Sequence, residues 1–191
     1  MSHRLDPTIL REYDIRGIVG KNLSAADARA IGRAYAVTVA AAGGAGTPSV
    51  AVGYDGRLTS PELEAALTDG LAAGGVDVVR VGRGPTPMLY YAAATLGVDA
   101  GVMVTGSHNP PDYNGFKFVL AGKPFYGAAI QKLGETVAAL GAAAPRHGRI
   151  SERAVREDYI DRLLRDYDGA RPLRVAWDVG NGATGEVVQQ L

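Results

Sequence analysis

The sequence contains no cysteine, a single tryptophan and only three phenylalanines among its 191 residues. The lack of cysteine excludes a disulfide framework and a thiolate metal site, and it fits a reducing compartment. An excess of one charge is lacking too, because 20 lysines and arginines balance 20 aspartates and glutamates. This balance argues against a protein that binds nucleic acid or an anionic membrane non-specifically.

Long apolar runs are also missing. The longest bland run, from Ala34 to Gly46, is too short and too rich in glycine to span a bilayer. The first ten residues have no apolar centre of the kind that signal peptides carry. We therefore expect a cytoplasmic protein with neither a membrane nor a nucleic acid as partner. Its length is enough for one domain and part of a second.

The sequence does contain an alternation of helical and strand-like segments. Short runs rich in β-branched residues predict three buried strands, at residues 49–55, 76–82 and 99–106. Helices are predicted before and between them, from start signals at Ser24, at Ser60-Pro61-Glu62 and near Pro87. The alternation indicates an α/β domain, layered α/β/α, with helices on both faces of a sheet.

The next segment alternates in polarity, at residues 115–122, and predicts a fourth strand, antiparallel and at the edge of the sheet. A helix from about Gly127 to Leu140 follows. The sheet is therefore expected to be mixed and four-stranded.

A change of composition at residues 141–150 predicts a domain boundary, with one domain at residues 1–150. Residues 151–168 have the charge pattern of a linker helix. Residues 172–185 indicate a strand that runs into a glycine-rich turn, and a helix begins at Gly185. A lone strand and helix cannot bury their faces, because a parallel strand needs neighbours. We therefore expect residues 151–191 to be the incomplete start of a second, similar domain, or to dock elsewhere.

The most informative stretch is the loop after the third predicted strand. It places Ser107 at the carboxyl end of the sheet, where α/β proteins bind their ligands. We expect Gly106 to adopt a backbone conformation that other residues resist. His108 is expected to be a poor base for Ser107, because adjacent side chains on an extended segment point apart. The simpler alternative is a polar turn whose serine and asparagine bond only the backbone.

The residues around Ser107 favour phosphoryl transfer. Acyl transfer would need a Gly-x-Ser-x-Gly turn, and Thr105 and Asn109 stand where its glycines would be. Phosphoryl transfer depends more on positioning and on nearby positive charge than on a strong adjacent base. Lys117 and a distant arginine could supply that charge.

The loop sequence TGSHNPPDYNGFK, at residues 105–117, resembles the phosphoserine loop of the α-D-phosphohexomutases, most closely the phosphomannomutase/phosphoglucomutase branch. The related phosphoglucosamine mutases typically carry an alanine at the position of Gly106 and an isoleucine at that of Phe116. Three further stretches resemble the family in the same order, at residues 11–17, 52–57 and 175–185.

The resemblance implies four domains around a cleft, and an enzyme that interconverts hexose 1- and 6-phosphates of mannose or glucose. It implies a phosphoserine enzyme, a hexose 1,6-bisphosphate intermediate, and glucose 1,6-bisphosphate as activator. Ser107 would be phosphorylated, and its phosphate would be one ligand of Mg²⁺. Lys117 and His108 would lie beside it, Arg16 would contact the phosphoserine, and Tyr13 would line the same wall.

The departures from the family pattern matter as well. The family's other magnesium ligands come from an Asp-x-Asp-x-Asp loop, and this sequence has none. Asp166 and Asp168 have the spacing most similar to that of this loop, and they are expected on a solvated face. The loops of the third and fourth domains are absent too. We therefore expect that domains 2–4 are missing and that the 191 residues alone are inactive. A non-catalytic fragment that binds phosphate or a partner, and a phosphoglucosamine mutase, stay open as alternatives.

Taken singly, the same residues have plain structural interpretations. Arg16 is then a surface arginine in a loop, Tyr13 a half-buried aromatic residue, and Lys117 a solubilising lysine on an edge strand. For Asp55 and Arg57 we predict structural or supporting roles rather than direct contact with a substrate.

Overall fold

The structure is a computed structural model that describes residues 3–43, 46–141, 144, 146–172 and 174–191. A mixed sheet lies at its centre. Its strands are β1 (Ile15–Ile18), β2 (Ser49–Tyr54), β3 (Asp77–Arg83), β4 (Ala100–Val104), β5 (Tyr113–Leu120), β6 (Lys123–Phe125) and β7 (Ile150–Glu152). They are arranged in the order β1-β5-β4-β2-β3-β7, and β6 pairs with β5. The pairs β4–β2, β2–β3 and β3–β7 are parallel, whereas β5 is antiparallel to β4, β1 and β6.

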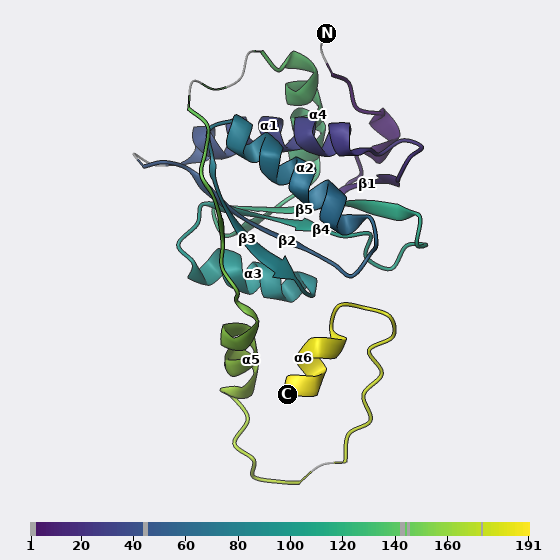
Figure 1. Ribbon diagram of the computed structural model, residues 1–191, viewed down its shortest axis with the longest axis vertical. Coiled ribbons are helices and arrows are strands. Elements are labelled where there is room, and N and C mark those ends of the chain that lie inside the picture. Colours follow the sequence, from purple (N-terminus) through teal and green to yellow (C-terminus); the bar gives the residue numbers. More distant parts are fainter. Residues whose placement is uncertain (1–2, 44–45, 142–143, 145, 173) are drawn as a thin grey trace.

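Helices cover both faces of this sheet (Figure 1). One face carries α1 (Ala25–Ala42), α2 (Ser60–Ala73) and α4 (Ala128–Ala139), and the other carries α3 (Thr86–Thr95). A short 3-10 helix, η1 (Pro7–Ile9), precedes β1, and α5 (Arg156–Leu164) and α6 (Gly185–Gln190) lie beyond α3. The layered α/β architecture predicted from the sequence is confirmed. No described helix is both long enough and apolar enough to cross a membrane.

Strand alternation divides the core between the two faces of the sheet. Val104, Phe116 and Phe118 are buried with α1, α2 and α4, whereas Met103 is buried on the α3 side. Helices α1 and α2 pack closely because small residues face each other. A Cβ atom on Gly70 would lie only 2.1 Å from the carbonyl oxygen of Arg29. The absence of a side chain at Gly70 therefore allows α1 and α2 to approach each other closely above the sheet.

Several details of the sheet differ from the prediction. The described residues form seven strands rather than four, because β1, β6 and β7 have only three or four residues each and leave little periodicity to detect. The segment predicted as an edge is internal, since β5 has β4 on one side and β1 and β6 on the other. Ser60 is not a helix cap. It is buried and begins α2, and it donates a hydrogen bond to Asp55 instead. The capping role of Ser24 is confirmed, as part of a capping box with Asp27.

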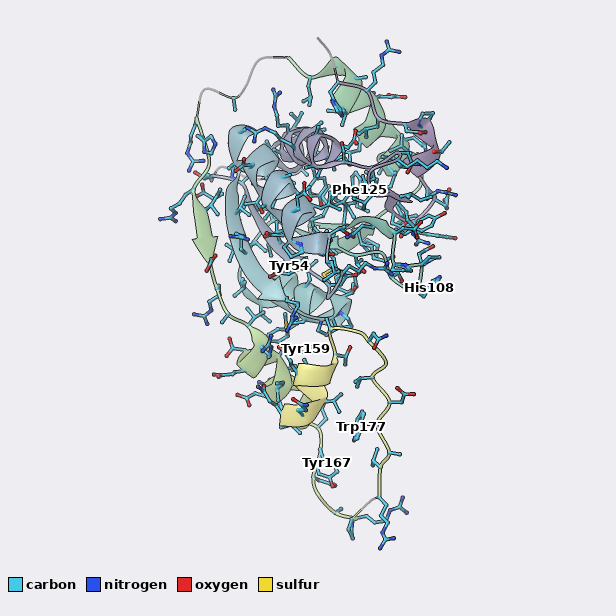
Figure 2. The ribbon with its side chains drawn as sticks, turned by 45° about the vertical axis from the view of Figure 1, so that its right-hand side comes forward. Tyr54, His108, Phe125, Tyr159, Tyr167 and Trp177 are labelled. Atoms are coloured by element: carbon cyan, nitrogen blue, oxygen red, sulfur yellow. The ribbon has the colours of Figure 1, made fainter. Side chains whose placement is uncertain are left out.

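The last forty residues depart furthest from the prediction. The expected linker helix at 151–168 is shorter, because residues 150–152 pair with β3 as strand β7 and α5 begins only at Arg156. The described residues from 174 to 184 form neither strand nor helix. Figure 2 shows Trp177 on this stretch and Tyr167 on the segment that follows α5. The division into a domain at residues 1–150 and the start of a second one stays a prediction, and residues 142, 143 and 145 of its boundary lie outside the described residues.

The predicted helix from Gly185 is confirmed as α6, which packs back toward the body. Val187 is buried, with 2% of its surface exposed. Glu186 forms ion pairs with Arg83 at the end of β3 and with Arg156 of α5. The end of the chain is therefore anchored, although the loop before it is not packed.

Candidate active site

A pocket of about 760 Å³ lies at the carboxyl end of the parallel strands. At this point the strand order reverses, because β3 lies on one side of β2 and β4 on the other, and such reversals are where open α/β sheets bind ligands. The loops after these three strands form the pocket, together with the turn before α6. Its lining residues fall in four groups, within 55–59, 84–86, 105–111 and 181–183.

Ser107 lines this pocket and has an unusual backbone. It is exposed and has a φ of 54°, in the left-handed region that non-glycine residues rarely adopt. The prediction that Gly106 takes the unusual conformation is therefore wrong. Gly106 is needed for a different reason, since a Cβ atom there would lie 2.4 Å from the Arg57 guanidinium and 2.7 Å from the Tyr113 carbonyl oxygen.

The turn at Ser107 also changes the relation between Ser107 and His108. The Ser107 Oγ and the His108 Nδ1 are 3.3 Å apart, although adjacent side chains were expected to point apart. That expectation assumed an extended segment, and the left-handed φ of Ser107 bends the chain instead. His108 is exposed and lies at the surface (Figure 2). The geometry therefore allows a proton to pass between the hydroxyl and the imidazole.

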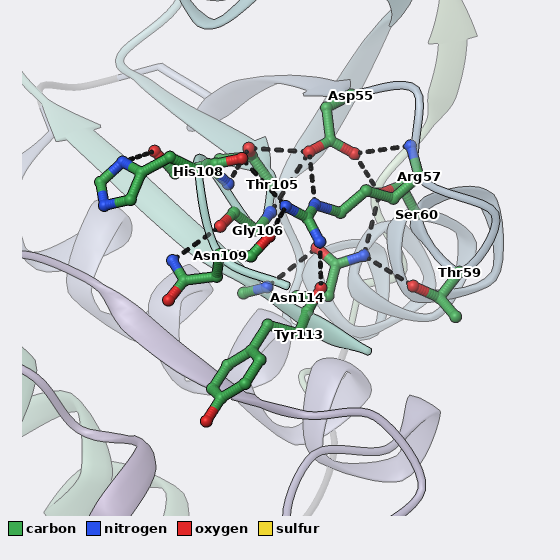
Figure 3. Close-up of polar contacts among 12 residues, drawn as sticks. Asp55, Arg57, Thr59, Ser60, Thr105, Gly106, His108, Asn109, Tyr113 and Asn114 are labelled. Carbon is green, nitrogen blue, oxygen red and sulfur yellow. Dashed lines mark hydrogen bonds and ion pairs between the residues drawn. The ribbon is translucent and has the colours of Figure 1, made fainter. Parts of the chain in front are cut away.

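The side chain of Arg57 holds the loop from inside (Figure 3). Its two terminal nitrogens donate to four backbone carbonyls. The oxygens belong to Pro110 at 2.6 Å, Asn109 at 2.7 Å, Ser107 at 2.9 Å and Tyr113 at 3.0 Å. One side chain thus joins four backbone positions of the loop.

Asp55 holds the start of the same loop. One of its oxygens accepts from the Arg57 backbone N–H at 3.0 Å and from the Ser60 hydroxyl at 2.5 Å. The other accepts from the Thr105 hydroxyl at 2.8 Å and from the Gly106 N–H at 3.2 Å. The sequence predicted a structural or supporting role for both residues, and these contacts agree with it.

Asn109 and Asn114 complete the network of the loop. The Asn109 side chain donates to the Gly106 carbonyl at 2.9 Å. The buried Asn114 amide donates at 2.9 Å to the hydroxyls of Thr59 and Ser60. The simple interpretation of Asn109, as a residue that bonds the backbone, is therefore right for that side chain.

A second polar group lies on the neighbouring strands. Arg16 is on β1, not in a loop, and Lys117 is on β5, with their side chains on the same face of the sheet. Both contact the buried Asp14, the Arg16 Nη2 at 2.5 Å and the Lys117 Nζ at 3.2 Å from the same carboxylate oxygen. Sequence reasoning missed Asp14. The signal available in the sequence was that Arg16 and Lys117 were both predicted near the site, while no carboxylate was predicted to pair with their positive charges.

The structure does not bring Tyr13 into the loop network. Its side chain is 72% exposed, more than the half-buried aromatic residue that was the alternative, and its ring centroid lies 6.2 Å from that of Tyr126. Within the part of the chain that the structure describes, no hydrogen bond joins Lys117 or Arg16 to Ser107 either. The structure therefore places the predicted residues in three groups: Ser107 with His108, Arg16 with Lys117, and Tyr13 with Tyr126.

The described residues offer few ligands for a magnesium ion. They contain no group of three or more histidines, aspartates or glutamates placed to hold a metal ion. Both oxygens of Asp55 already accept hydrogen bonds, Asp166 pairs with Arg162, and Asp168 accepts from the Ala170 N–H. These side chains do not form a cage for Mg²⁺ by themselves.

The sequence of the chain is similar to those of known proteins. Residues 7–143 match the family described as phosphoglucomutase/phosphomannomutase, alpha/beta/alpha domain I. The chain is 45% identical over 187 residues to a phosphomannomutase/phosphoglucomutase of Pseudomonas aeruginosa, which covers 98% of the chain and 40% of that relative. It is also 45% identical over 184 residues to a phosphoglucomutase of Neisseria gonorrhoeae, covering 96% of the chain and 39% of that relative.

A solved structure is similar over the same length. It is a phosphoglucomutase/phosphomannomutase family protein from Burkholderia thailandensis, with 46% identity and a TM-score of 0.89. The match covers 97% of this chain and 42% of that one. The chain therefore spans about 40% of the length of the curated relatives it matches.

Proposed function

The chain belongs to the phosphoglucomutase/phosphomannomutase family, and we propose on this premise that it carries the phosphoserine part of a phosphosugar mutase. The proposed reaction interconverts the 1- and 6-phosphates of mannose or glucose. It passes through a phosphoserine enzyme and a hexose 1,6-bisphosphate that reorients in the cleft. The observation that supports the proposal best is Ser107, an exposed hydroxyl held in a left-handed turn on the wall of the pocket.

Ser107, His108, Lys117, Arg16 and Tyr13 would each have a defined role in the reaction. The Ser107 Oγ would form a bond to phosphorus while the bond from phosphorus to the donor sugar oxygen breaks. The Ser107 proton would pass to the His108 Nδ1, which lies 3.3 Å away, or to the leaving oxygen. Lys117 and Arg16 would supply positive charge as negative charge builds on the transferring group. Tyr13 would line the wall on the side of Tyr126.

Magnesium and glucose 1,6-bisphosphate are proposed as cofactor and activator. Mg²⁺ would neutralise charge on the phosphoserine, for which these residues would provide a single ligand through the Ser107 phosphate. The described side chains include no group of three or more histidines, aspartates or glutamates placed to hold the ion, and a second wall for the sugar would have to come from further domains. We therefore propose that a polypeptide of these 191 residues has no mutase turnover of its own.

The decisive experiment is Ser107→Ala in a full-length protein that contains this sequence. Turnover of glucose 1-phosphate or mannose 1-phosphate should be lost, apart from a small residual rate if a bisphosphate can still shuttle. Intact mass should show one phosphate on the unsubstituted protein and none on the variant. Ser151→Ala, which removes an exposed serine on β7, is the matched control and should keep both properties. Turnover near that of the unsubstituted protein in Ser107→Ala would overturn the proposal.

Glucosamine phosphate belongs in the same assay as a third substrate. Preference for it would favour the phosphoglucosamine mutase alternative, despite the glycine at position 106. Retained phosphate binding without turnover of any of the three sugars would favour the non-catalytic alternative.

A further inference from the structure

Arg57 is the one arginine among the described residues that line the pocket, so it is the obvious candidate to bind a ligand phosphate. Its hydrogen bonds argue against that role. The two terminal nitrogens have four N–H groups, and these already meet four carbonyl oxygens of the loop. The remaining Nε faces the Asp55 carboxylate at 3.4 Å. Four of the five N–H groups of Arg57 are therefore bonded to the loop, and the fifth lies beside a carboxylate, so none is left to point at a ligand phosphate.

The contacts converge instead on the backbone of Ser107. Its N–H donates to the Thr105 hydroxyl at 2.8 Å, and that hydroxyl donates to Asp55 at 2.8 Å. Its carbonyl accepts from Arg57 at 2.9 Å. Arg57 thus holds the Ser107 carbonyl directly, and Asp55 holds the Ser107 N–H through the Thr105 hydroxyl. Asp55 and Arg57 also contact each other.

This arrangement explains how Ser107 keeps its conformation. A left-handed φ in a residue other than glycine costs free energy, and it persists only where the surroundings impose it. The side chain of Arg57 is well shielded, with 16% of its surface exposed, as is that of Asp55. Shielding from water strengthens charge-assisted hydrogen bonds of this kind.

We propose that Asp55 and Arg57 are a positioning pair that fixes Ser107 in its left-handed turn and aims its hydroxyl into the pocket, without touching the ligand. The effect of this pair on phosphoryl transfer rests on the proposed function, whereas its effect on the conformation of Ser107 does not. A shift of about 1 Å at a reacting atom can lower a rate about a hundredfold. Loosening the pair should therefore lower kcat and leave KM nearly unchanged.

The conformational role can be tested by hydrogen exchange on the 191-residue chain. Arg57→Met removes every donor and keeps an unbranched apolar stem. Amide exchange in residues 106–113 should rise about tenfold or more, while Val102 to Val104 in β4 stay protected. Arg29→Met is the matched control, because Arg29 pairs with Asp69 on the exposed surface of the helical layer and should leave the loop unchanged.

The catalytic consequence can be tested in a full-length protein that contains this sequence. Arg57→Met should lower kcat about a hundredfold with KM within about threefold. Arg57→Lys should recover part of kcat, because an ammonium group keeps the charge and some of the bonds. If Arg57→Met does not fold, Thr105→Val is the second variant, since it removes the acceptor of the Ser107 N–H and conserves volume. It should give the same local exchange and the same kcat loss.

The outcomes separate the two proposals. Unchanged exchange in residues 106–113, or an equal rise through β4, overturns the positioning pair. Looser exchange with normal kcat in an active protein overturns it as well. If the unsubstituted protein turns over no sugar phosphate while the loop loosens as described, the proposed function fails and the conformational role of the pair stands.

Discussion

Phe116 and Trp177 lie in similar apolar runs of sequence but in very different structural surroundings. Each aromatic residue sits in a short apolar run that predicts a strand, and Phe116 in β5 is completely buried. Trp177 lies in a loop and is 64% exposed, and Val175 nearby is 56% exposed. The difference lies in the neighbours, because β5 has strands on both sides and the described residues around Trp177 pair with none. An apolar run becomes a strand only where another strand can take its hydrogen bonds.

The largest expected effect is on the buried side of this comparison. Phe116→Ala should lower the free energy of unfolding by about 3–5 kcal/mol, because it leaves a cavity between the sheet and the layer of α1, α2 and α4. Chemical denaturation followed by circular dichroism measures it. Phe116→Leu is the comparison variant and should cost less than Phe116→Ala, because it leaves a smaller cavity. A loss below about 1 kcal/mol for the alanine variant would mean that this core is not the main source of stability.

The second prediction tests whether Arg16 and Lys117, which both contact Asp14, act in the chemistry. Lys117→Ala should lower kcat about a hundredfold, about 3 kcal/mol in activation free energy, with a smaller effect on KM. Arg16→Ala should also release more hexose 1,6-bisphosphate, because a weaker grip lets the intermediate escape. The assay needs a full-length protein that contains this sequence. Normal kcat and no released bisphosphate in both variants would leave Arg16 and Lys117 as structural partners of Asp14.

The sequence predicted those strands whose residue pattern and length both indicate a strand. Strands β2 and β4 were predicted to within about two residues, because each is a short β-branched run between helical segments. Strand β7 was not predicted. Its three residues, from Ile150 to Glu152, carry no periodicity, and their pairing with β3 depends on tertiary structure alone.

The position of the serine loop was predicted from the sequence, but its geometry was not. Ser107 was singled out correctly as a loop residue at the carboxyl end of the sheet. Which residue turns left-handed could not be derived, because the usual preference favours Gly106 and the side chain of Arg57, which contacts this loop, lies about fifty residues away in the chain. Asp14 was missed because its significance lies in a contact with Lys117, which is 103 residues away in the chain.

The smallest expected effect is on the exposed side of the comparison. Trp177→Ala should change the free energy of unfolding by no more than about 0.5 kcal/mol, because a side chain that is 64% exposed buries little surface to lose. Trp177 is the single tryptophan of the sequence, so the fluorescence of the unsubstituted chain reports on this site alone. Its emission should resemble that of tryptophan in water, and acrylamide should quench it efficiently. A blue-shifted, protected emission together with a loss of stability like that of Phe116→Ala would contradict the comparison, because Trp177 would then lie in a core of its own. Exposed emission in the 191-residue chain that becomes protected in a full-length protein would sharpen it, because the residues around Trp177 would then be shown to pack only where further chain supplies a neighbour.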